Sequence, residues 1–335
     1  MSQARIQKAA KNISWGYLNR TINIVFPFIF RTVLIHFMGE GYTGINSLFS
    51  SVLRVLNISE LGIGSALIYA MYEPIANNKK EKVEAYMNLF RKLYRIVGIV
   101  ILLLGSALLP MIPRLISGTY PKEINIYLTY FLFLMNTAIG YLTFAHDGSL
   151  LEAMQRNDLE NRNNAIVSLF RYFFEILSII LLKNFYGYLY VMLLFSFINN
   201  IVHHMTVRKY FPEFKCRGDI TEREKEQLKD NVFSIFCHKI GSVLLNNTDS
   251  IVISTIFGLQ LLVKYTNYLY IITSVEAIIV ICFSSVTSII GNSLITDTEE
   301  ENASIFKKVL FGNAWLVIVC SSIMLGCFQC FIRLG

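Results

Sequence analysis

Nine long apolar segments divide this chain of 335 residues. A helix needs about 20 mostly apolar residues to cross the hydrocarbon core of a bilayer. Hydrophobic residues make up 54% of the chain and charged residues 16%, whereas soluble domains carry about 25% charged residues. The pattern predicts an all-α polytopic membrane protein with about nine transmembrane helices. They are expected at roughly residues 13–37, 44–73, 95–113, 124–145, 165–182, 187–203, 232–257, 265–291 and 309–331.

The basic residues predict the orientation of the chain. Twenty Lys and Arg residues fall in the tails and loops on one side of the predicted spans, and five fall on the other. Because loops rich in Lys and Arg stay in the cytoplasm, the N-terminus is expected inside. This distribution accounts for the net charge of +7 without a nucleic-acid partner.

Two segments look like copies of each other. An ungapped shift of 219 residues maps Arg20 to Lys239 and Gly39 to Gly258. The copies open the first and the seventh predicted spans, and because six is even, both begin on the same side of the membrane. The repeat is therefore expected to be parallel, with its pseudo-twofold axis along the membrane normal.

The predicted spans define two lobes. Residues 1–203 are expected to form an N-terminal six-helix lobe, in which a tight hairpin at 183–186 joins the fifth and sixth spans. Residues 204–231 read as a solvated cytoplasmic linker with a charged helix, and residues 232–335 as a partial C-terminal lobe of about three helices. A truncated second lobe is the favoured explanation, and a naturally odd-numbered protein is the alternative.

Cations inside apolar segments mark the expected substrate path, because a charge at membrane depth costs roughly 2.5–3.5 kcal/mol. Arg20, Asn23, Pro27 and Arg31 share one face of the first span. Pro27 frees a backbone carbonyl and is expected to act as a hinge. With matching groups from the second and seventh spans, the predicted substrate-binding residues are Arg20, Asn23, Arg31, Arg54, Lys239 and Asn246.

Other readings of these charged groups stay open. The heads of Arg20, Arg31 and Lys239 could instead reach the nearest membrane surface, as long basic side chains do. Arg171 and Glu175 are four residues apart and are expected to form a structural ion pair. The buried acids either bind protons or sodium in ion coupling or stay protonated and inert; they are Glu60, Asp249 and Glu276.

No catalytic, cofactor or metal site is expected. His146-Asp147 is the most catalytic-looking dyad, but an interfacial loop accounts for it. Cys327 and Cys330 form a CxxC inside an apolar segment, where inert thiols are expected rather than a metal or redox site.

Several short runs carry a resemblance. They are NISELGIGSAL at 57–67, YEPIA at 72–76, NKKEK at 78–82, HKIGSV at 238–243, NTD at 247–249 and YTNY at 265–268. The first three resemble the second span and following loop of bacterial polysaccharide flippases, and the others resemble that family's seventh and eighth spans. These proteins belong to the multidrug/oligosaccharidyl-lipid/polysaccharide exporter superfamily.

The resemblance implies a two-lobed, six-plus-six exporter fold in the bacterial cytoplasmic (inner) membrane. Such a carrier flips undecaprenyl-pyrophosphate-linked oligosaccharides between leaflets for surface polysaccharide synthesis. Its partners would be the lipid-linked substrate, membrane lipid and polysaccharide-assembly proteins. One alternative is a cation-coupled drug or metabolite exporter of the same fold. A second is a membrane-embedded polysaccharide polymerase or glycosyltransferase.

Overall fold

The computed structural model describes residues 3–57, 62–118, 120–296 and 299–334, and every element that these residues form is a helix. The predicted all-α class is therefore confirmed. The elements are α1 (Gln3–Met38), α2 (Glu40–Leu56), α3 (Ile63–Ala76), α4 (Lys80–Ala107), the 3₁₀ helix η2 (Leu109–Leu115), α5 (Ile126–Leu142), α6 (Ala145–Ala153), α7 (Asn157–Leu182), α8 (Phe185–Tyr210), α9 (Glu222–Phe257), α10 (Leu259–Thr296) and α11 (Glu299–Leu334).

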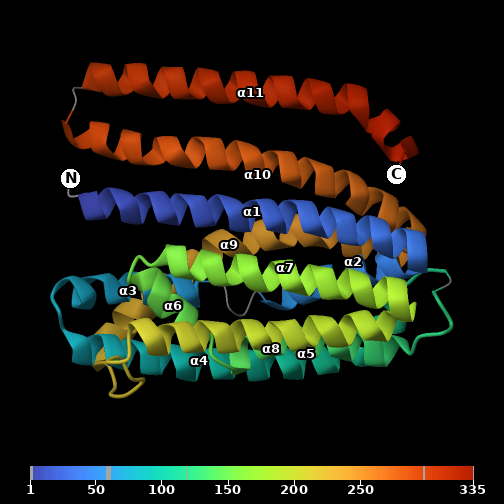
Figure 1. The fold of residues 1–335 in the computed structure, drawn as a ribbon, viewed down its shortest axis with the longest axis horizontal. Coiled ribbons are helices and arrows are strands. Elements are labelled where there is room, and N and C mark those ends of the chain that lie inside the picture. Colours follow the sequence, from blue (N-terminus) through green and yellow to red (C-terminus); the bar gives the residue numbers. More distant parts are fainter. Residues whose placement is uncertain (1–2, 58–61, 119, 297–298, 335) are drawn as a thin grey trace. The chain divides into compact units, whose positions relative to one another are not determined.

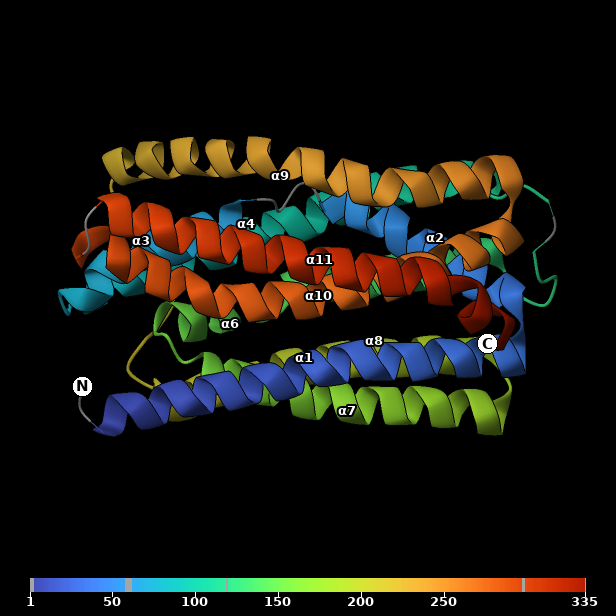
Figure 2. The same cartoon turned by 90° about the horizontal axis from the view of Figure 1, so that it is seen from above.

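The chain divides into two compact units, Met1–Val263 and Lys264–Gly335. In the first unit, α1 packs along α7, α7 pairs with α8, and α5 packs against α4 and α8 (Figures 1 and 2). In the second unit, Tyr268 of α10 and Phe328 of α11 meet edge to face, with ring centroids 5.1 Å apart. The predicted lobe boundary at residue 232 differs from this division, because α9 packs against α2 and α3.

Several helices suit a membrane-spanning role. Among the described residues, four are long and apolar enough: Ser14–Met38, Asn157–Leu182, Phe185–Tyr210 and Glu300–Phe328. Two bent pairs bring the number to six if each pair counts as one span. These helices indicate a multi-pass membrane protein. The count of nine spans and the exporter fold stay predictions.

The span predicted over residues 44–73 is two helices rather than one, which corrects the expectation of a single long span. α2 ends at Leu56 and α3 begins at Ile63. Gly62, just before α3, has a φ of 96°, a conformation that glycine adopts at little cost and other residues avoid. The next predicted span is also broken, since η2 follows α4 at a bend of 59°.

A buried apolar cluster holds the helices together near the break between α2 and α3. It joins α3, α4 and α6 through Leu67, Met71, Phe90 and Leu151, all of which are at most 2% exposed. Leu228 of α9 belongs to the same cluster. The first turns of α9 are therefore packed against α3, α4 and α6.

The left-handed turn at Gly62 leads to the first prediction. A Cβ atom there would lie 2.8 Å from the carbonyl oxygen of Val232 on α9, in addition to the strained φ. We expect Gly62→Ala to destabilise the protein by about 1–3 kcal/mol, measured as a lower thermal unfolding temperature in detergent. Gly140→Ala is the control, because no atom of the described residues lies within 4 Å of a Cβ there. Equal unfolding temperatures for the two variants would contradict the strained turn.

Candidate functional site

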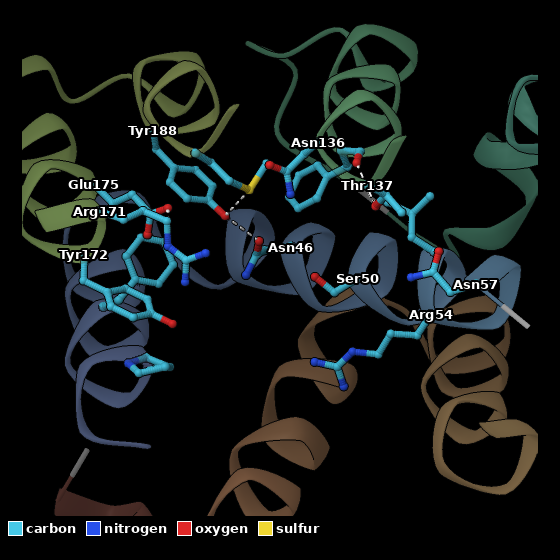
Figure 3. A pocket seen from close by; sticks show the side chains of 15 residues that line it. Asn46, Ser50, Arg54, Asn57, Asn136, Thr137, Arg171, Tyr172, Glu175 and Tyr188 are labelled. Atoms are coloured by element: carbon cyan, nitrogen blue, oxygen red, sulfur yellow. Dashed lines mark hydrogen bonds and ion pairs between the residues drawn. The ribbon is translucent and has the colours of Figure 1, made fainter. Parts of the chain in front are cut away.

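A polar cavity of about 390 Å³ lies among α1, α2, α5, α7 and α8. Figure 3 shows the polar side chains of α2, α5, α7 and α8 gathered around it. Two arginines and one carboxylate line it, so its formal charge is positive. The lining residues are Pro27, Phe30, Asn46, Ser50, Leu53, Arg54, Asn57, Phe133, Asn136, Thr137, Arg171, Tyr172, Glu175, Tyr188 and Met192.

The ion pair in the cavity wall comes from α7. Arg171 Nε lies 3.6 Å from Glu175 Oε1, at the four-residue spacing predicted for the pair. Glu175 is only 3% exposed. The Arg171 guanidinium lies 4.5 Å from the ring centroid of Tyr172, yet its Nε has no hydrogen-bond partner among the described residues. The Nε is buried against Glu175, but the Arg171 side chain as a whole is 29% exposed, so part of it stays open to the cavity.

Neutral polar groups line other parts of the cavity. The Tyr188 hydroxyl donates a hydrogen bond of 2.9 Å to Asn46 Oδ1, which ties α8 to α2. The Ser196 hydroxyl donates to Asn136 Oδ1 at 2.5 Å and ties α8 to α5. Amide and hydroxyl groups both donate and accept hydrogen bonds. The wall can therefore bind a hydroxyl-rich ligand such as a sugar.

Arg54 supplies the second cation. It lies in the last turn of α2, and its side chain is exposed. Ser50 and Asn57 lie near it along the same edge of the cavity (Figure 3). A flexible guanidinium at an open edge can bind an anionic group and follow it inward.

The cavity contains only some of the predicted site residues. Arg54, Pro27, Arg171 and Glu175 line it. By contrast, Arg31 donates to Ser47 Oγ at 3.1 Å and to the carbonyl of Val263 at 3.2 Å. Arg31 is therefore hydrogen-bonded within the protein, to Ser47 of α2 and to Val263 near the start of α10, and it is not among the residues that line the cavity.

The other predicted residues fall into two groups. Arg20 and Asn23 are exposed on α1, and Asn23 donates to Asn19 Oδ1 at 2.8 Å. The acids Asp249 and Glu276 are also exposed. The other three predicted residues lie outside what the structure describes. Glu60 is not described at all, and the side chains of Lys239 and Asn246 are not described.

The sequence alone did not reveal the neutral members of the site, chiefly Asn46, Asn136 and Tyr188. They come from three helices, and no linear spacing relates them. One signal was present within α8, where Tyr188, Ser196 and Asn200 recur at multiples of four residues. Polar residues on one face of an apolar helix mark a protein-facing or water-facing side.

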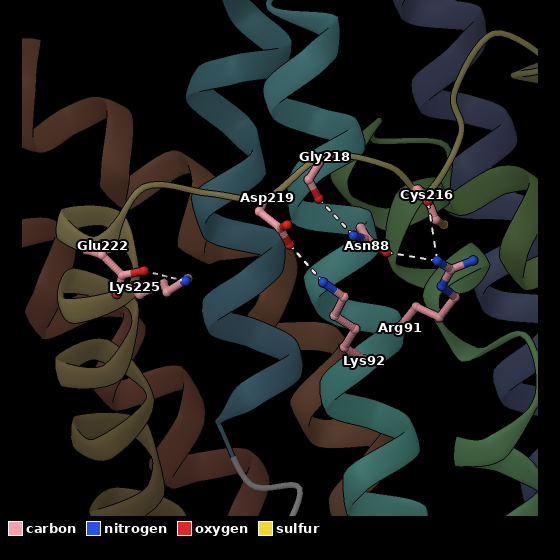
Figure 4. A network of polar contacts seen from close by, with 8 residues as sticks. All are labelled: Asn88, Arg91, Lys92, Cys216, Gly218, Asp219, Glu222 and Lys225. Carbon is pink, nitrogen blue, oxygen red and sulfur yellow. Dashed lines mark hydrogen bonds and ion pairs between the residues drawn. The ribbon is translucent and has the colours of Figure 1, made fainter.

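The predicted linker is bonded to α4, and its bonded residues Lys215, Arg217, Gly218 and Asp219 stay exposed. Glu84 of α4 is 1% exposed; it accepts hydrogen bonds from the backbone N–H of Lys215 at 3.0 Å and from Arg217 Nε at 2.6 Å. Asn88 donates to the carbonyl of Gly218 at 2.8 Å, and Lys92 pairs with Asp219 at 2.8 Å (Figure 4). The linker is therefore a strap over the start of α4.

A scan against models of protein families, a search of curated proteins and a search of solved structures all found no match.

The second prediction concerns the ion pair. Glu175→Ala leaves the Arg171 guanidinium without its carboxylate in a largely water-free wall. We expect a loss of roughly 2–3 kcal/mol in stability, measured by thermal unfolding in detergent. The double variant Arg171→Met/Glu175→Leu should recover most of it, because no buried charge is left unpaired.

The matched control for this pair is Glu222→Ala. Glu222 pairs with Lys225 at 2.6 Å, but its side chain is 86% exposed, and exposed pairs contribute at most about 1 kcal/mol. A Glu175→Ala variant as stable as Glu222→Ala would mean that the buried pair is unimportant for folding.

The third prediction concerns acid stability. Glu224 accepts hydrogen bonds from Lys82 Nζ at 2.6 Å and from Thr221, and these bonds lower the pKa of Glu224 to about 2 from its usual 4.5. A depressed pKa stabilises the folded state above pH 4.5, and that stabilisation is lost as the pH falls from 4.5 towards 2. We expect the unfolding temperature to fall less steeply over this range in Glu224→Gln than in the wild type. Glu226→Gln, an exposed neighbour on α9, should follow the wild-type profile.

Proposed function

We propose that this protein translocates a lipid-linked oligosaccharide, with an undecaprenyl-pyrophosphate carrier, across the bacterial cytoplasmic membrane. One observation supports this most directly: the cavity combines an excess of positive charge with neutral hydrogen-bonding groups, inside a bundle of helices apolar enough to span a membrane. The resemblance to polysaccharide flippases points to the same substrate class. In this proposal the N-terminus is cytoplasmic and the second lobe completes the path.

The chemistry of the cavity suits both parts of such a head group. A pyrophosphate with its sugars cannot cross hydrocarbon unaided, because its polar groups would lose their hydrogen bonds to water. Arg54 and Arg171 would bind the pyrophosphate oxygens through charge-assisted hydrogen bonds. Asn46, Asn136 and Tyr188 would take the place of water around the sugar hydroxyls, while the polyprenyl tail stays in the lipid.

Transport also requires that the path open to each side in turn. The proposed mechanism is a rocking motion of lobes around the bound head group. Pro27 in α1 lies beside the cavity, and the break between α2 and α3 follows the lining residue Asn57. At both places the run of backbone hydrogen bonds is already interrupted, so a bend there breaks few further bonds.

A second candidate function has a specific observation in its favour. Glu175 is the one carboxylate among the lining residues, and the rings of Phe30, Tyr172 and Tyr188 surround the same cavity. Aromatic faces and a carboxylate attract organic cations. An exporter of cationic drugs would use these groups, but the two arginines oppose a cationic ligand.

The fourth prediction separates these candidates by native mass spectrometry of the full chain with undecaprenyl pyrophosphate or with an organic drug cation. We expect retention of the pyrophosphate lipid, and a loss of about tenfold in affinity in Arg54→Gln, since a hydrogen bond to a charged group is worth about 1.5–3 kcal/mol. Arg114→Gln is the control, because this exposed arginine lies in η2, away from the cavity lining.

The outcomes differ clearly. Selective retention of the drug cation would favour the exporter. Equal losses in Arg54→Gln and Arg114→Gln would mean that net charge, rather than the cavity, attracts the lipid. Retention of neither ligand by the wild type would overturn the proposed function for this chain.

A further inference from the structure

An arginine ends the apolar outer face of α4. Arg95, Ile99 and Leu103 fall within an arc of about 80° around this helix, since successive residues are about 100° apart. Arg95 is exposed, and the two apolar side chains are 51% and 66% exposed. This face of α4 is therefore turned away from the bundle, and its apolar part ends at a guanidinium.

The same arrangement occurs on α8. Phe197, Met205 and Arg208 also fall within an arc of about 80° around their helix. Arg208 is exposed, and the two apolar side chains are 44% and 64% exposed. An apolar outer face that ends at an arginine suits a helix whose end lies at the level of lipid head groups.

Both arginines lie on one outer side of α5, which packs against α4 and α8 (Figures 1 and 2). Gly98 marks the face of α4 that meets α5, and Asn200 marks that face of α8. Around their helices and in the same sense, Arg95 is about 60° from Gly98 and Arg208 is about 80° from Asn200. The linker after α8 is bonded to the start of α4, so the two helices run in opposite directions. Equal rotations on antiparallel neighbours of α5 bring both side chains to the same side of it.

A third arginine lies with these two around the start of α6. Arg91 Nη2 donates to the carbonyl of Cys216 in the linker at 3.3 Å (Figure 4). Cys216 is within electrostatic reach of Arg91 and Arg208. His146, at the start of α6, is within reach of Arg91 and Arg95. Cations from α4 and α8 therefore gather at one place, where the linker crosses α4.

The carboxylates near this place are already bonded elsewhere. Asp147 is 3% exposed and lies 2.7 Å from a histidine nitrogen of α8. Glu84 is 1% exposed and accepts from Arg217 Nε at 2.6 Å. Neither Arg95 nor Arg208 makes a hydrogen bond or an ion pair within the part of the chain that the structure describes. Two exposed guanidiniums therefore keep their charge and their donors for a partner outside the protein.

We propose that Arg95 and Arg208 bind the phosphate of an anionic membrane lipid, whose acyl chains lie along the apolar outer faces of α4 and α8. Guanidinium groups bind phosphate oxygens through paired, charge-assisted hydrogen bonds. Arg91, which is held by the linker, adds positive charge behind them. Basic sites between membrane helices select head groups with a net negative charge.

The lipid site is separate from the cavity. None of its three arginines lines the cavity, so the site does not depend on what the cavity carries. A lipid held by both α4 and α8 bridges two helices that α5 separates. Because such a ligand binds the folded protein and not the unfolded chain, it raises the unfolding temperature.

The fifth prediction tests this site by native mass spectrometry of the full chain with phosphatidylglycerol, which is anionic, or with phosphatidylcholine, which is zwitterionic. We expect the wild type to retain phosphatidylglycerol at least about tenfold more tightly, because hydrogen bonds to charged groups are strong. Arg95→Gln/Arg208→Gln should lose most of that preference. Both arginines are exposed, so the double variant should unfold at the wild-type temperature in detergent without lipid.

The matched control is Lys79→Gln/Lys80→Gln, which also removes two exposed positive charges. These lysines lie more than about 20 Å from Arg95 along the axis of α4, and we expect the control to keep the wild-type preference. Equal retention of the two lipids by the wild type would overturn the site. An equal loss in both double variants would overturn it too, because net charge alone would then attract the lipid.

A competition measurement separates a membrane lipid from soluble phosphate. Inorganic phosphate in large excess should leave phosphatidylglycerol bound, because phosphate alone makes no contact with the apolar faces of α4 and α8. Displacement of the lipid by phosphate would overturn a membrane lipid as the occupant. In addition, nanodiscs of phosphatidylglycerol should raise the unfolding temperature of the wild type above its value in phosphatidylcholine, and Arg95→Gln/Arg208→Gln should lose this difference. The absence of any difference in the wild type would contradict the proposed bridge between α4 and α8.

Discussion

Hydrocarbon offers no hydrogen bonds, so each interruption of a membrane helix must find its partners within the protein. In the described part of the chain, helices are interrupted before Gly62, at η2 and between α5 and α6, and α9 contacts the first two of these places. Gly62 packs against the backbone of Val232 and Phe236. At the other end, Ser254 Oγ donates to the carbonyl of Leu115 at 2.7 Å, and its carbonyl accepts from Ser117 N–H at 3.0 Å. Because α9 contacts the chain at both of these places, the first compact unit extends through α9 to Val263.

Features set by local spacing could be predicted from the sequence. The apolar segments gave the helical class, and the turn at Lys183 and Asn184 joins α7 to α8 where the tight hairpin was expected. The Arg171–Glu175 pair forms because four residues bring both side chains to one helix face. The contacts between the linker and α4 could not be predicted from local spacing, because Glu84 and Arg217 lie 133 residues apart. Charges whose partners are distant in sequence look solvated until the fold is known.

The cavity shows a second limit of sequence reasoning. Arg20 and Arg31 share a helix face in the sequence, but packing decides which part of that face is used. α1 packs along α7, where the ring centroids of Phe26 and Tyr172 stack 6.0 Å apart and Asn19 Nδ2 donates to Asn161 Oδ1 at 3.0 Å. These contacts turn Pro27 and Phe30 towards the cavity. The cations that do line it, Arg54 and Arg171, belong to two other helices.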